Sequence, residues 1–379
     1  MKNTNELKIL ELKKADYLIV KCIRSWVKSV VFKQNPIPQL INYLMSYGRV
    51  ETVIPFDDLM TSISLSSVKI YDFRKHDCCY VGETEKEILK ILYLFQCENT
   101  DMALNYIKDL VDNIYIKKTF NSAKLIPGAH RYLPGWKTKS KAFRDMMSDQ
   151  SKSQIDVVYD EETNLSMDVF SPGPYVEATV IFLYGGFWTD YEKSIFSYLA
   201  MGPVLNNMRV IIPTLPKCPD ATIPEINKSF YRCLRLVCRR FTGDILLVGQ
   251  QSGAHVIGRS ISKGELPKPI LERIKHVMLL SPISDLKPLL YTDKKDELHL
   301  TEEVANSESL SSLDLADKMN VTIWVGADER PIYLEQAQEL ATAWRCSWVK
   351  SKNRHHLDIA DGLGKNTSQL MNTLMAYRF

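Results

Sequence analysis

The chain has 379 residues, of which 45% are hydrophobic and 25% are charged, with a formal net charge of +3. This composition is typical of a globular protein and excludes collagen-like, low-complexity and largely disordered chains. The charge is too balanced to require an acidic polymer as partner, and no segment has the roughly 18 consecutive apolar residues of a membrane-spanning helix. With no signal-peptide pattern at the amino terminus, we expect a cytoplasmic protein without a membrane anchor, the nucleus being the alternative location.

The first 120 residues show helical patterns. Apolar residues between Ile9 and Val27 recur at helical spacing, Pro36 and Pro38 close that stretch, and a short helix is expected over residues 39–47. The segment 50–80 shows no clear pattern. We therefore predict a mainly helical amino-terminal domain over residues 1–120.

Two more helices are expected within this domain. Thr84 and Glu87 have the spacing of a capping box in front of an apolar run, and Thr100 or Asp101 can cap a helix over residues 102–116. Both segments are amphipathic, so we expect them to form a helical hairpin.

The amino-terminal region carries an excess of basic residues. Residues 1–50 contain nine Lys or Arg against three acidic residues, which gives the first helix a basic face. This pattern indicates a solvated face, and docking to an acidic partner or to RNA is the alternative. Aromatic residues are too sparse there for a nucleic-acid platform, so we expect a protein partner through residues 1–120 rather than a nucleic acid.

The cysteines match no zinc or disulfide framework. There are eight of them, including the adjacent pair Cys78 and Cys79, and their spacing favours reduced, mostly buried thiols. A metal site formed by these two residues with His76 and Cys97 is the alternative. We expect no metal and no cofactor.

The pattern of apolar and polar residues changes at about residue 146. A stretch rich in Pro and Gly predicts a linker over residues 121–145, and residues 146–379 alternate short apolar strands with helices. This alternation predicts a mostly parallel sheet covered by helices on both faces. The expected strands are 154–159, 166–170, 178–184, 209–213, 244–249, 276–280, 321–325 and 347–350, with helices starting near 194, 223, 253, 332 and 367.

Two glycine motifs follow expected strands. The first is Tyr184-Gly-Gly-Phe-Trp188, in which Gly185 and Gly186 let successive backbone N–H groups face one point, as the stabilisation of an oxyanion requires. The second has Gly249 and Gly253 at the G-x-S-x-G spacing of a nucleophile elbow. Its central residue, where a serine hydrolase has its nucleophile, is Gln251.

Other residues of a triad follow in chain order. Ser252 lies one position after the centre of the elbow, where helix capping or an oxyanion amide suits it better than nucleophilic attack. The segment after the 321–325 strand offers Asp328 and Glu329, and the segment after the last strand offers His355 and His356. The order of elbow, acid and histidine is that of α/β-hydrolases.

From about residue 140 to the end, the sequence resembles the kynurenine formamidase (arylformamidase) branch of the α/β-hydrolase esterases. The matching stretches are YGGFW, KCPDATIPEI, GQQSGAH, SPISDLKPL, GADERPIYLEQAQ and HHLDI. The resemblance implies an α/β-hydrolase domain over residues 146–379.

The resemblance also assigns site residues. It places the family's nucleophile at Gln251, its acid at Glu329 with Asp328 as the alternative, and its histidine at His356 with His355 as the alternative. The oxyanion amides would belong to Gly186 or Phe187 and to Ser252. The chain departs from the family at Gln251 and at Tyr184, where the family has histidine.

A carboxamide has no ionisable proton for a histidine to remove, so Gln251 cannot form an acyl-enzyme. The sequence therefore predicts a catalytically inactive α/β-hydrolase-like protein that works by protein binding, with a small-molecule ligand also possible in its pocket. The alternative is an active hydrolase of small esters or formamides that uses Ser252 or a water activated by histidine. A nucleic-acid-associated factor is a third hypothesis, and it rests on the basic amino-terminal helix alone.

Overall fold

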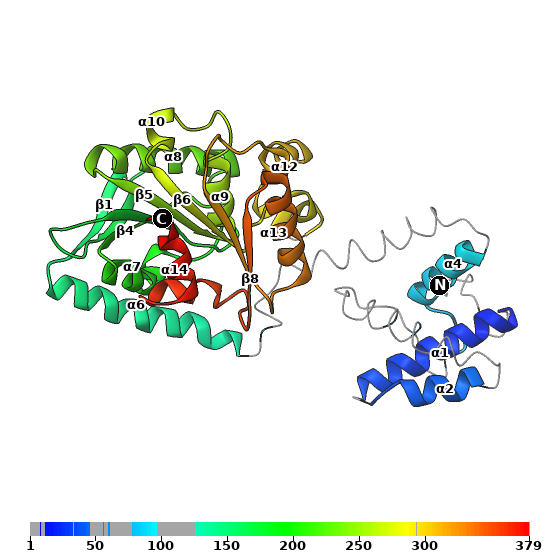
Figure 1. Cartoon of the computed structure of the whole chain (residues 1–379). Helices are drawn as coiled ribbons and strands as arrows, with labels where there is room; N and C mark the ends of the chain where they lie inside the picture. The colour runs from blue at the N-terminus through cyan, green and yellow to red at the C-terminus, as the bar shows by residue number, and fades with distance from the viewer. Residues whose placement is uncertain are drawn as a thin grey trace. The chain divides into compact units, whose positions relative to one another are not determined.

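The structure is a computed structural model of the chain. It describes residues 8, 12–32, 34–45, 56, 60, 78–96, 126, 128–292 and 294–378. The chain divides into two compact units, Met1–Lys118 and Thr119–Phe379, which we call the first and second units (Figure 1).

The described part of the first unit is helical, as the sequence predicts. Its helices are α1 (Lys14–Val31), α2 (Ile37–Met45) and α4 (Glu83–Gln96). Their apolar faces enclose a small core, which includes Cys22, Ile23, Trp26, Leu40, Leu44, Met60 and Ile88. The helix predicted over 102–116 and most of the segment 50–80 lie outside the described residues.

A buried ion pair links α1 to α4. Arg24 and Glu85 are 1% and 0% exposed, and the Nε atom of Arg24 donates to Oε1 of Glu85 at 2.9 Å. The same guanidinium donates to the carbonyl oxygens of Cys78 and Tyr80, each at 2.6 Å. The carboxylate compensates the positive charge of Arg24, and the two carbonyl oxygens accept from its remaining N–H groups. A basic residue of helix α1 can therefore be buried in the core.

The predicted cap of α4 is displaced. The helix begins at Glu83, and Glu85 accepts the backbone N–H of Gly82 at 2.8 Å. The capping box expected from Thr84 and Glu87 is therefore wrong. Thr84 lies inside the helix, and the carboxylate of Glu85 accepts from the backbone N–H of Gly82, the residue before the helix.

The second unit has an eight-stranded sheet in the order β1-β2-β4-β3-β5-β6-β7-β8. Strands β1 and β2 pair antiparallel, β2 pairs antiparallel with β4, and the remaining neighbours are parallel. The predicted fold class, a mostly parallel sheet with helices, is confirmed. The strands are β1 (Ser153–Asp160), β2 (Leu165–Phe170), β3 (Ala178–Leu183), β4 (Met208–Pro213), β5 (Asp244–Gln250), β6 (Ile274–Leu280), β7 (Val321–Gly326) and β8 (Ser347–Ser351).

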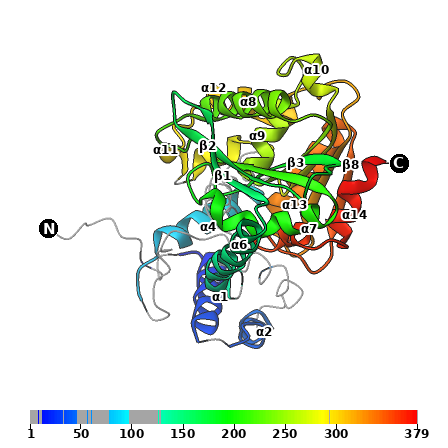
Figure 2. The ribbon, with the colours of Figure 1, turned by 90° about the vertical axis from the view of Figure 1, so that its left-hand side faces the viewer.

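Helices cover both faces of this sheet (Figures 1 and 2). Alternate residues of a strand belong to different cores: Ile181 packs with α8 and α9 on one face, and Phe182 packs with α6 and α14 on the other. The central strands are apolar on both sides for this reason. The main helices are α6 (Tyr132–Asp149), α7 (Met201–Leu205), α8 (Ile223–Arg240), α9 (Ser252–Ser260), α10 (Lys268–Leu271), α11 (Lys294–Glu297), α12 (Glu302–Glu308), α13 (Pro331–Trp344) and α14 (Gln369–Met375).

Most of the predicted linker is helical. Helix α6 includes residues 132–145 of the expected linker, and its Trp136 and Phe143 are buried against the sheet. Of the Pro and Gly residues that suggested a linker, Pro134 and Gly135 belong to this helix. They lie in the first turn of α6, where a missing backbone N–H breaks no helical hydrogen bond.

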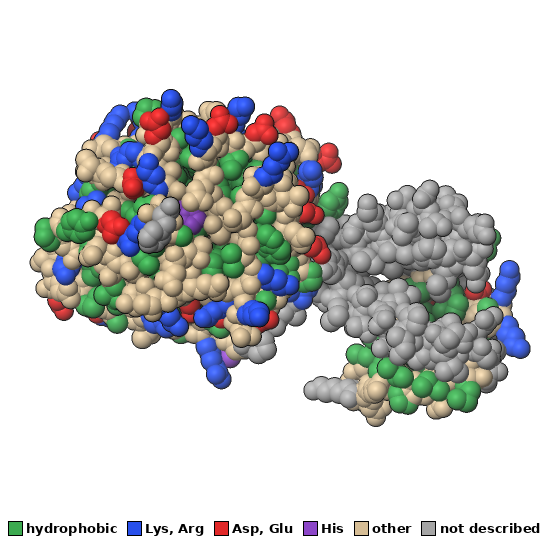
Figure 3. Space-filling view, in the orientation of Figure 1, with side chains coloured by type: hydrophobic (Ala, Val, Ile, Leu, Met, Phe, Trp, Pro, Cys, Tyr) green, Lys and Arg blue, Asp and Glu red, His purple; other side chains and the backbone are tan. Residues whose placement is uncertain are grey.

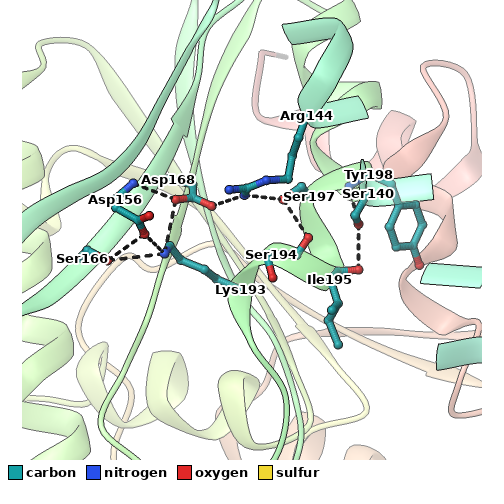
Figure 4. A network of polar contacts seen from close by, with 10 residues as sticks. All are labelled: Ser140, Arg144, Asp156, Ser166, Asp168, Lys193, Ser194, Ile195, Ser197 and Tyr198. Carbon is teal, nitrogen blue, oxygen red and sulfur yellow. Dashed lines mark hydrogen bonds and ion pairs between the residues drawn. The ribbon is translucent and has the colours of Figure 1, made fainter. Parts of the chain in front are cut away.

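A buried charged network joins α6 to the antiparallel edge of the sheet (Figure 4). Asp168 of β2 is 0% exposed and contacts both Arg144 of α6 and Lys193. Lys193 also binds Asp156 of β1, whose backbone N–H donates to Asp168 at 3.1 Å. Lys193, which follows the YGGFW motif, is thus held by these carboxylates.

Charged side chains of both signs are interspersed over the face of the second unit that Figure 3 shows. None of the helices in the described ranges is long and apolar enough to cross a membrane. The part of the chain that the structure describes also contains no group of three or more His, Cys, Asp or Glu suited to a metal ion. Two members of the alternative metal site, His76 and Cys97, fall outside it.

Candidate active site

The turn between β5 and α9 has the geometry of a nucleophile elbow. Gln251 connects the two elements with φ 52° and ψ −112°, which is rare for a residue with a side chain. The flanking glycines make this turn possible. A Cβ atom on Gly249 would lie 2.6 Å from the Cα atom of Ala254, and one on Gly253 would lie 2.3 Å from the carbonyl oxygen of Leu183.

The side chain of Gln251 lies at the predicted oxyanion donors. Its Oε1 atom accepts the backbone N–H groups of Gly186 at 2.8 Å and of Phe187 at 3.2 Å. The first distance is typical of an oxyanion donor and its oxygen, and the second is slightly longer. Gly185 leaves room for the amide, because a Cβ atom there would be 3.0 Å from both Cβ and Oε1 of Gln251.

The other end of the amide is also held. Its Nε2 atom donates to the hydroxyl of Tyr333 at 3.3 Å, and Gln251 is 3% exposed. Because Oε1 can only accept and Nε2 can only donate, these partners fix the orientation of the amide. A buried carboxamide with partners at both ends is a stable plug.

A histidine and a carboxylate lie next to this plug. The Nδ1 atom of His356 is 2.7 Å from Oε2 of Glu329, and both residues are buried. Glu329 also accepts from the hydroxyl of Ser281 at 2.5 Å and from the backbone N–H of Gly326 at 2.8 Å. With three protein donors, the buried carboxylate of Glu329 is fully hydrogen-bonded and can orient the imidazole in the way that the acid of a Ser-His-acid triad does.

Tyr333 connects the plug to the pair. Its ring stacks on the imidazole of His356 with centroids 4.2 Å apart and an interplanar angle of 27°. Sequence reasoning missed Tyr333 and Ser281. Both lie within the stretches that carry the family resemblance, Ser281 directly after β6 and Tyr333 in the first turn of α13, and those positions were the available signal.

The alternative acid and histidine lie elsewhere. Asp328 is exposed, and its backbone N–H donates to the carbonyl of Arg354. His355 binds the hydroxyl of Tyr132 through Nε2 at 2.9 Å and faces Asp358 through Nδ1 at 3.3 Å. The structure thus pairs Glu329 with His356 rather than their neighbours, and Tyr333 contacts both His356 and Gln251.

Ser252 begins α9 and is 2% exposed. It lines a cavity of about 30 Å³ together with Tyr184, Gly185 and Trp188, and His356 is not among the lining residues. This volume holds about two water molecules. Within the described residues the side-chain oxygen of Gln251 accepts hydrogen bonds from the backbone amides of Gly186 and Phe187, and the predicted amide of Ser252 makes no hydrogen bond with it.

Tyr184 and Trp188 of the YGGFW motif pack against other aromatic side chains. Tyr184 stacks on Phe196 with centroids 5.1 Å apart, and burial raises the pKa of its hydroxyl. Trp188 is 6% exposed and stands edge-on to His255 at 5.1 Å. The position where the family has histidine is therefore filled by a core tyrosine.

Known proteins are similar to the second unit. The kynurenine formamidase of Danio rerio is 27% identical over 210 residues, which cover 53% of this chain and 71% of that protein. The kynurenine formamidase of Salmo salar is 24% identical over 198 residues, covering 50% and 67%. No protein-family model matches the chain.

Solved structures agree on the fold. A candidate thioesterase from Silicibacter sp. TM1040 superposes with a TM-score of 0.66 and 29% identity, covering 69% of this chain and 99% of that one. An esterase from Pyrobaculum calidifontis superposes with a TM-score of 0.50 and 12% identity, covering 65% and 91%. The second unit therefore has the α/β-hydrolase fold, and its sequence is similar to those of kynurenine formamidases.

Proposed function

We propose that the second unit is a hydrolase scaffold that forms no acyl-enzyme, and that the protein works by binding. The observation that carries this proposal is the side chain of Gln251. Its Oε1 atom lies on the two oxyanion amides at 2.8 and 3.2 Å, where a substrate oxygen would have to bind.

Two separate chemical obstacles follow from this arrangement. An amide is a poor nucleophile with no proton for His356 to accept, and loss of a triad nucleophile typically costs about 10⁶ in turnover. In addition, the oxyanion hole is filled, so a residual activity supported by those amides is suppressed as well. On this proposal Glu329 and His356 have a structural role: their buried hydrogen bond connects the loop after β7 to the loop after β8.

Hydrolysis of small formamides or esters is the second candidate, and the comparisons favour it. The relatives similar in sequence are named kynurenine formamidases, and the structural neighbours include esterases. Such an activity requires Gln251 to leave the oxyanion hole, with His356 activating a water molecule or with Ser252 as nucleophile. The small cavity at Ser252 argues against the second route.

The experiment uses the full chain with a fluorophosphonate probe and with N-formylkynurenine and p-nitrophenyl acetate as substrates. We expect no covalent labelling and no turnover above that of His356→Ala. Turnover that disappears in His356→Ala but persists in Ser252→Ala would support the water route and refute our proposal. Labelling of Ser252 would identify that residue as the nucleophile and refute it equally.

The first unit is the proposed site of a protein partner. Its exposed apolar side chains include Val31 at 69%, Phe32 at 66% and Met45 at 61%. An affinity experiment with the full chain should recover a partner that the double variant Val31→Lys, Phe32→Glu fails to recover. The matched double variant Ile155→Lys, Val158→Glu, on the edge strand β1 of the second unit, should leave recovery unchanged. The opposite pattern would assign the partner to the second unit.

A further inference from the structure

The last two turns of α8 carry an arginine-rich surface on the outside of the second unit (Figure 1). The apolar residues of α8 pack on the sheet, and Arg235 and Arg239 lie one turn apart on the exposed side. Arg240 ends the helix, and its Cζ atom is 5.5 Å from the ring centre of Phe241, which is 4.0 Å from Cζ of Arg209 in β4. We call Arg209, Arg235, Arg239 and Arg240 the arginine patch. Within the described ranges none of the four forms an ion pair.

The acidic residues that flank the patch in the fold already have basic partners. The pairs are Asp160 with Arg232 at 2.7 Å, Asp244 with Lys275 at 3.9 Å, Glu177 with Arg378 at 2.5 Å and Glu272 with Lys268 at 3.7 Å. Strand β1 runs alongside α8 from Gln154, which accepts from Arg240 at 2.7 Å, to Asp160 at Arg232. Because Glu161 and Glu162 follow Asp160, they lie beyond Arg232 and away from the patch.

The arginine patch therefore has positive charges that the described part of the chain does not compensate. Burial and the neighbouring Arg240 lower the pKa of Arg209, as expected for a guanidinium close to a second one. A bound anion would relieve this repulsion. The planar guanidinium donates two parallel hydrogen bonds to a phosphate, and for this reason arginine predominates in sites that recognise phosphates.

Aromatic rings accompany the guanidiniums. Phe241 contacts Arg209 and Arg240, and the ring centre of Tyr231 is 5.8 Å from Cζ of Arg235. Both rings are partly exposed. Unpaired nucleobases stack on aromatic rings and on guanidinium planes, whereas the bases inside a duplex are not accessible to them. The combination of rings and guanidiniums therefore favours a single strand over a duplex.

A membrane surface is the other large anion with phosphate groups, and α8 lacks the apolar groups to bind it. Among the described residues, the large hydrophobic side chains that are exposed include none from α8. A helix that lies in the interface of a bilayer needs such side chains to enter its apolar region. The arginine patch therefore fits a dissolved polyanion better than a lipid surface.

We propose that the arginine patch binds a single-stranded polynucleotide, with phosphates at the four guanidiniums and bases against Tyr231 and Phe241. Arg235 and Arg239 are separated by about 6 Å along the helix axis, which is comparable to the spacing of successive phosphates in an extended strand. Binding through phosphates and stacking has little sequence preference and weakens steeply with salt. The site shares no residue with Gln251 and its partners, and it is distinct from the basic helix α1.

Fluorescence anisotropy of the full chain at pH 7 tests the proposal, with labelled oligouridylate and oligothymidylate of about 12 nucleotides as probes. At about 50 mM salt we expect a Kd of about 10 μM or tighter, and four phosphate contacts predict that log K falls against log salt concentration with a slope of about −3. Tighter binding of oligouridylate would point to RNA and its 2′-hydroxyl, equal binding to phosphates and bases alone, and both support the proposal. No binding of either probe up to about 1 mM, or a Kd that does not change with salt, would overturn it.

Two other anions test the assignment of the partner. They are poly-glutamate and vesicles that contain phosphatidylserine. We expect poly-glutamate to compete poorly with oligouridylate, because single carboxylates offer neither phosphates nor bases, and we expect the chain not to sediment with the vesicles. Sedimentation with vesicles in the absence of oligonucleotide binding would assign the patch to membranes and refute the proposal.

A double variant locates the binding site. Arg235→Gln with Arg239→Gln removes two exposed charges of the patch, so the affinity for oligouridylate should fall at least ten-fold and the salt slope to about half. The matched control is Lys350→Gln with Lys352→Gln, which removes the same charge at β8, the edge of the sheet opposite β1. This control should bind oligouridylate like the unmodified chain. Equal weakening by the two double variants would show that net charge alone attracts the strand and would refute the assignment to the patch.

Discussion

The side-chain oxygen of Gln251 lies 2.8 Å from the backbone nitrogen of Gly186 and accepts its hydrogen bond. The residue at the predicted nucleophile position therefore lies on the predicted oxyanion donors. Because Tyr333 contacts both this amide and His356, which pairs with Glu329, changing residue 251 tests the whole site.

Replacing Gln251 with serine should create a reactive hydroxyl. The smaller side chain frees the amides of Gly186 and Phe187, and His356 remains oriented by Glu329. We expect Gln251→Ser to react stoichiometrically with a fluorophosphonate, measured by intact mass. Gln251→Ala, which frees the same amides without a hydroxyl, is the control. If Gln251→Ser folds normally and does not react, residue 251, His356 and Glu329 do not have the relative positions of a catalytic triad.

The hydrogen bonds of Glu329 should contribute strongly to stability. The variant Glu329→Gln replaces a carboxylate that accepts from three buried donors with a neutral amide. The amide NH₂ cannot accept, so at least one of those donors then faces an N–H group. We expect the free energy of unfolding, measured with urea, to fall by about 3 kcal/mol. Asp328→Asn, at the exposed neighbouring position, should change it by less than about 0.5 kcal/mol. Similar values for the two variants would contradict the assignment of Glu329 as the buried partner.

His255 should make the second unit less stable in acid. Burial, opposed by the carbonyl of Glu308 and assisted by Arg259, lowers its pKa from 6.5 to about 4. Between these two pH values the unfolded chain binds a proton at His255 and the folded chain does not. The contribution of neutral His255 to the free energy of unfolding is therefore complete above pH 6.5 and is lost as the pH falls from 6.5 to about 4.

The measurement compares the unmodified chain with His255→Gln by urea unfolding at several pH values. Between pH 7 and pH 5 the unmodified chain should lose about 2 kcal/mol more than the variant. Parallel pH profiles would mean that His255 takes up its proton equally readily in the folded and unfolded chains, which would contradict the lowered pKa.

The network around Asp168 should be sensitive to loss of charge. Arg144 and Lys193 both contact this fully buried carboxylate, so Asp168→Asn leaves two cations without their shared anion. We expect the free energy of unfolding to fall by about 3–5 kcal/mol. Asp145→Asn breaks the exposed pair with Lys141 and should cost less than about 0.5 kcal/mol. A loss below 1 kcal/mol for Asp168→Asn would show that solvent compensates these charges.

The sequence predicted the sheet of the second unit well, because its strands are short apolar runs between turn residues. The strand Ala178–Leu183 is an example: it is buried on both faces, and Thr179 is its single polar residue. Helix α6 was missed because Pro134 and Gly135 are usually signs of a loop, and only their place in the first turn makes them compatible with a helix.

The candidate site could be predicted in part. The spacing of Gly249 and Gly253 places residue 251 at the turn, since both positions require the absence of a Cβ atom. The choice between Asp328 and Glu329 depends on which side chain faces inward, and the sequence contains this information only through the family resemblance. The contact of Gln251 with Tyr333 joins residues 82 positions apart, and no local pattern predicts it.

The amide of Gln251 joins three distant parts of the chain: the loop after β3, the turn before α9 and the first turn of α13. This arrangement has a consequence for the rigidity of the site. A shorter side chain at residue 251 would remove all of these bonds in one step, so the three segments would lose their common point of attachment together.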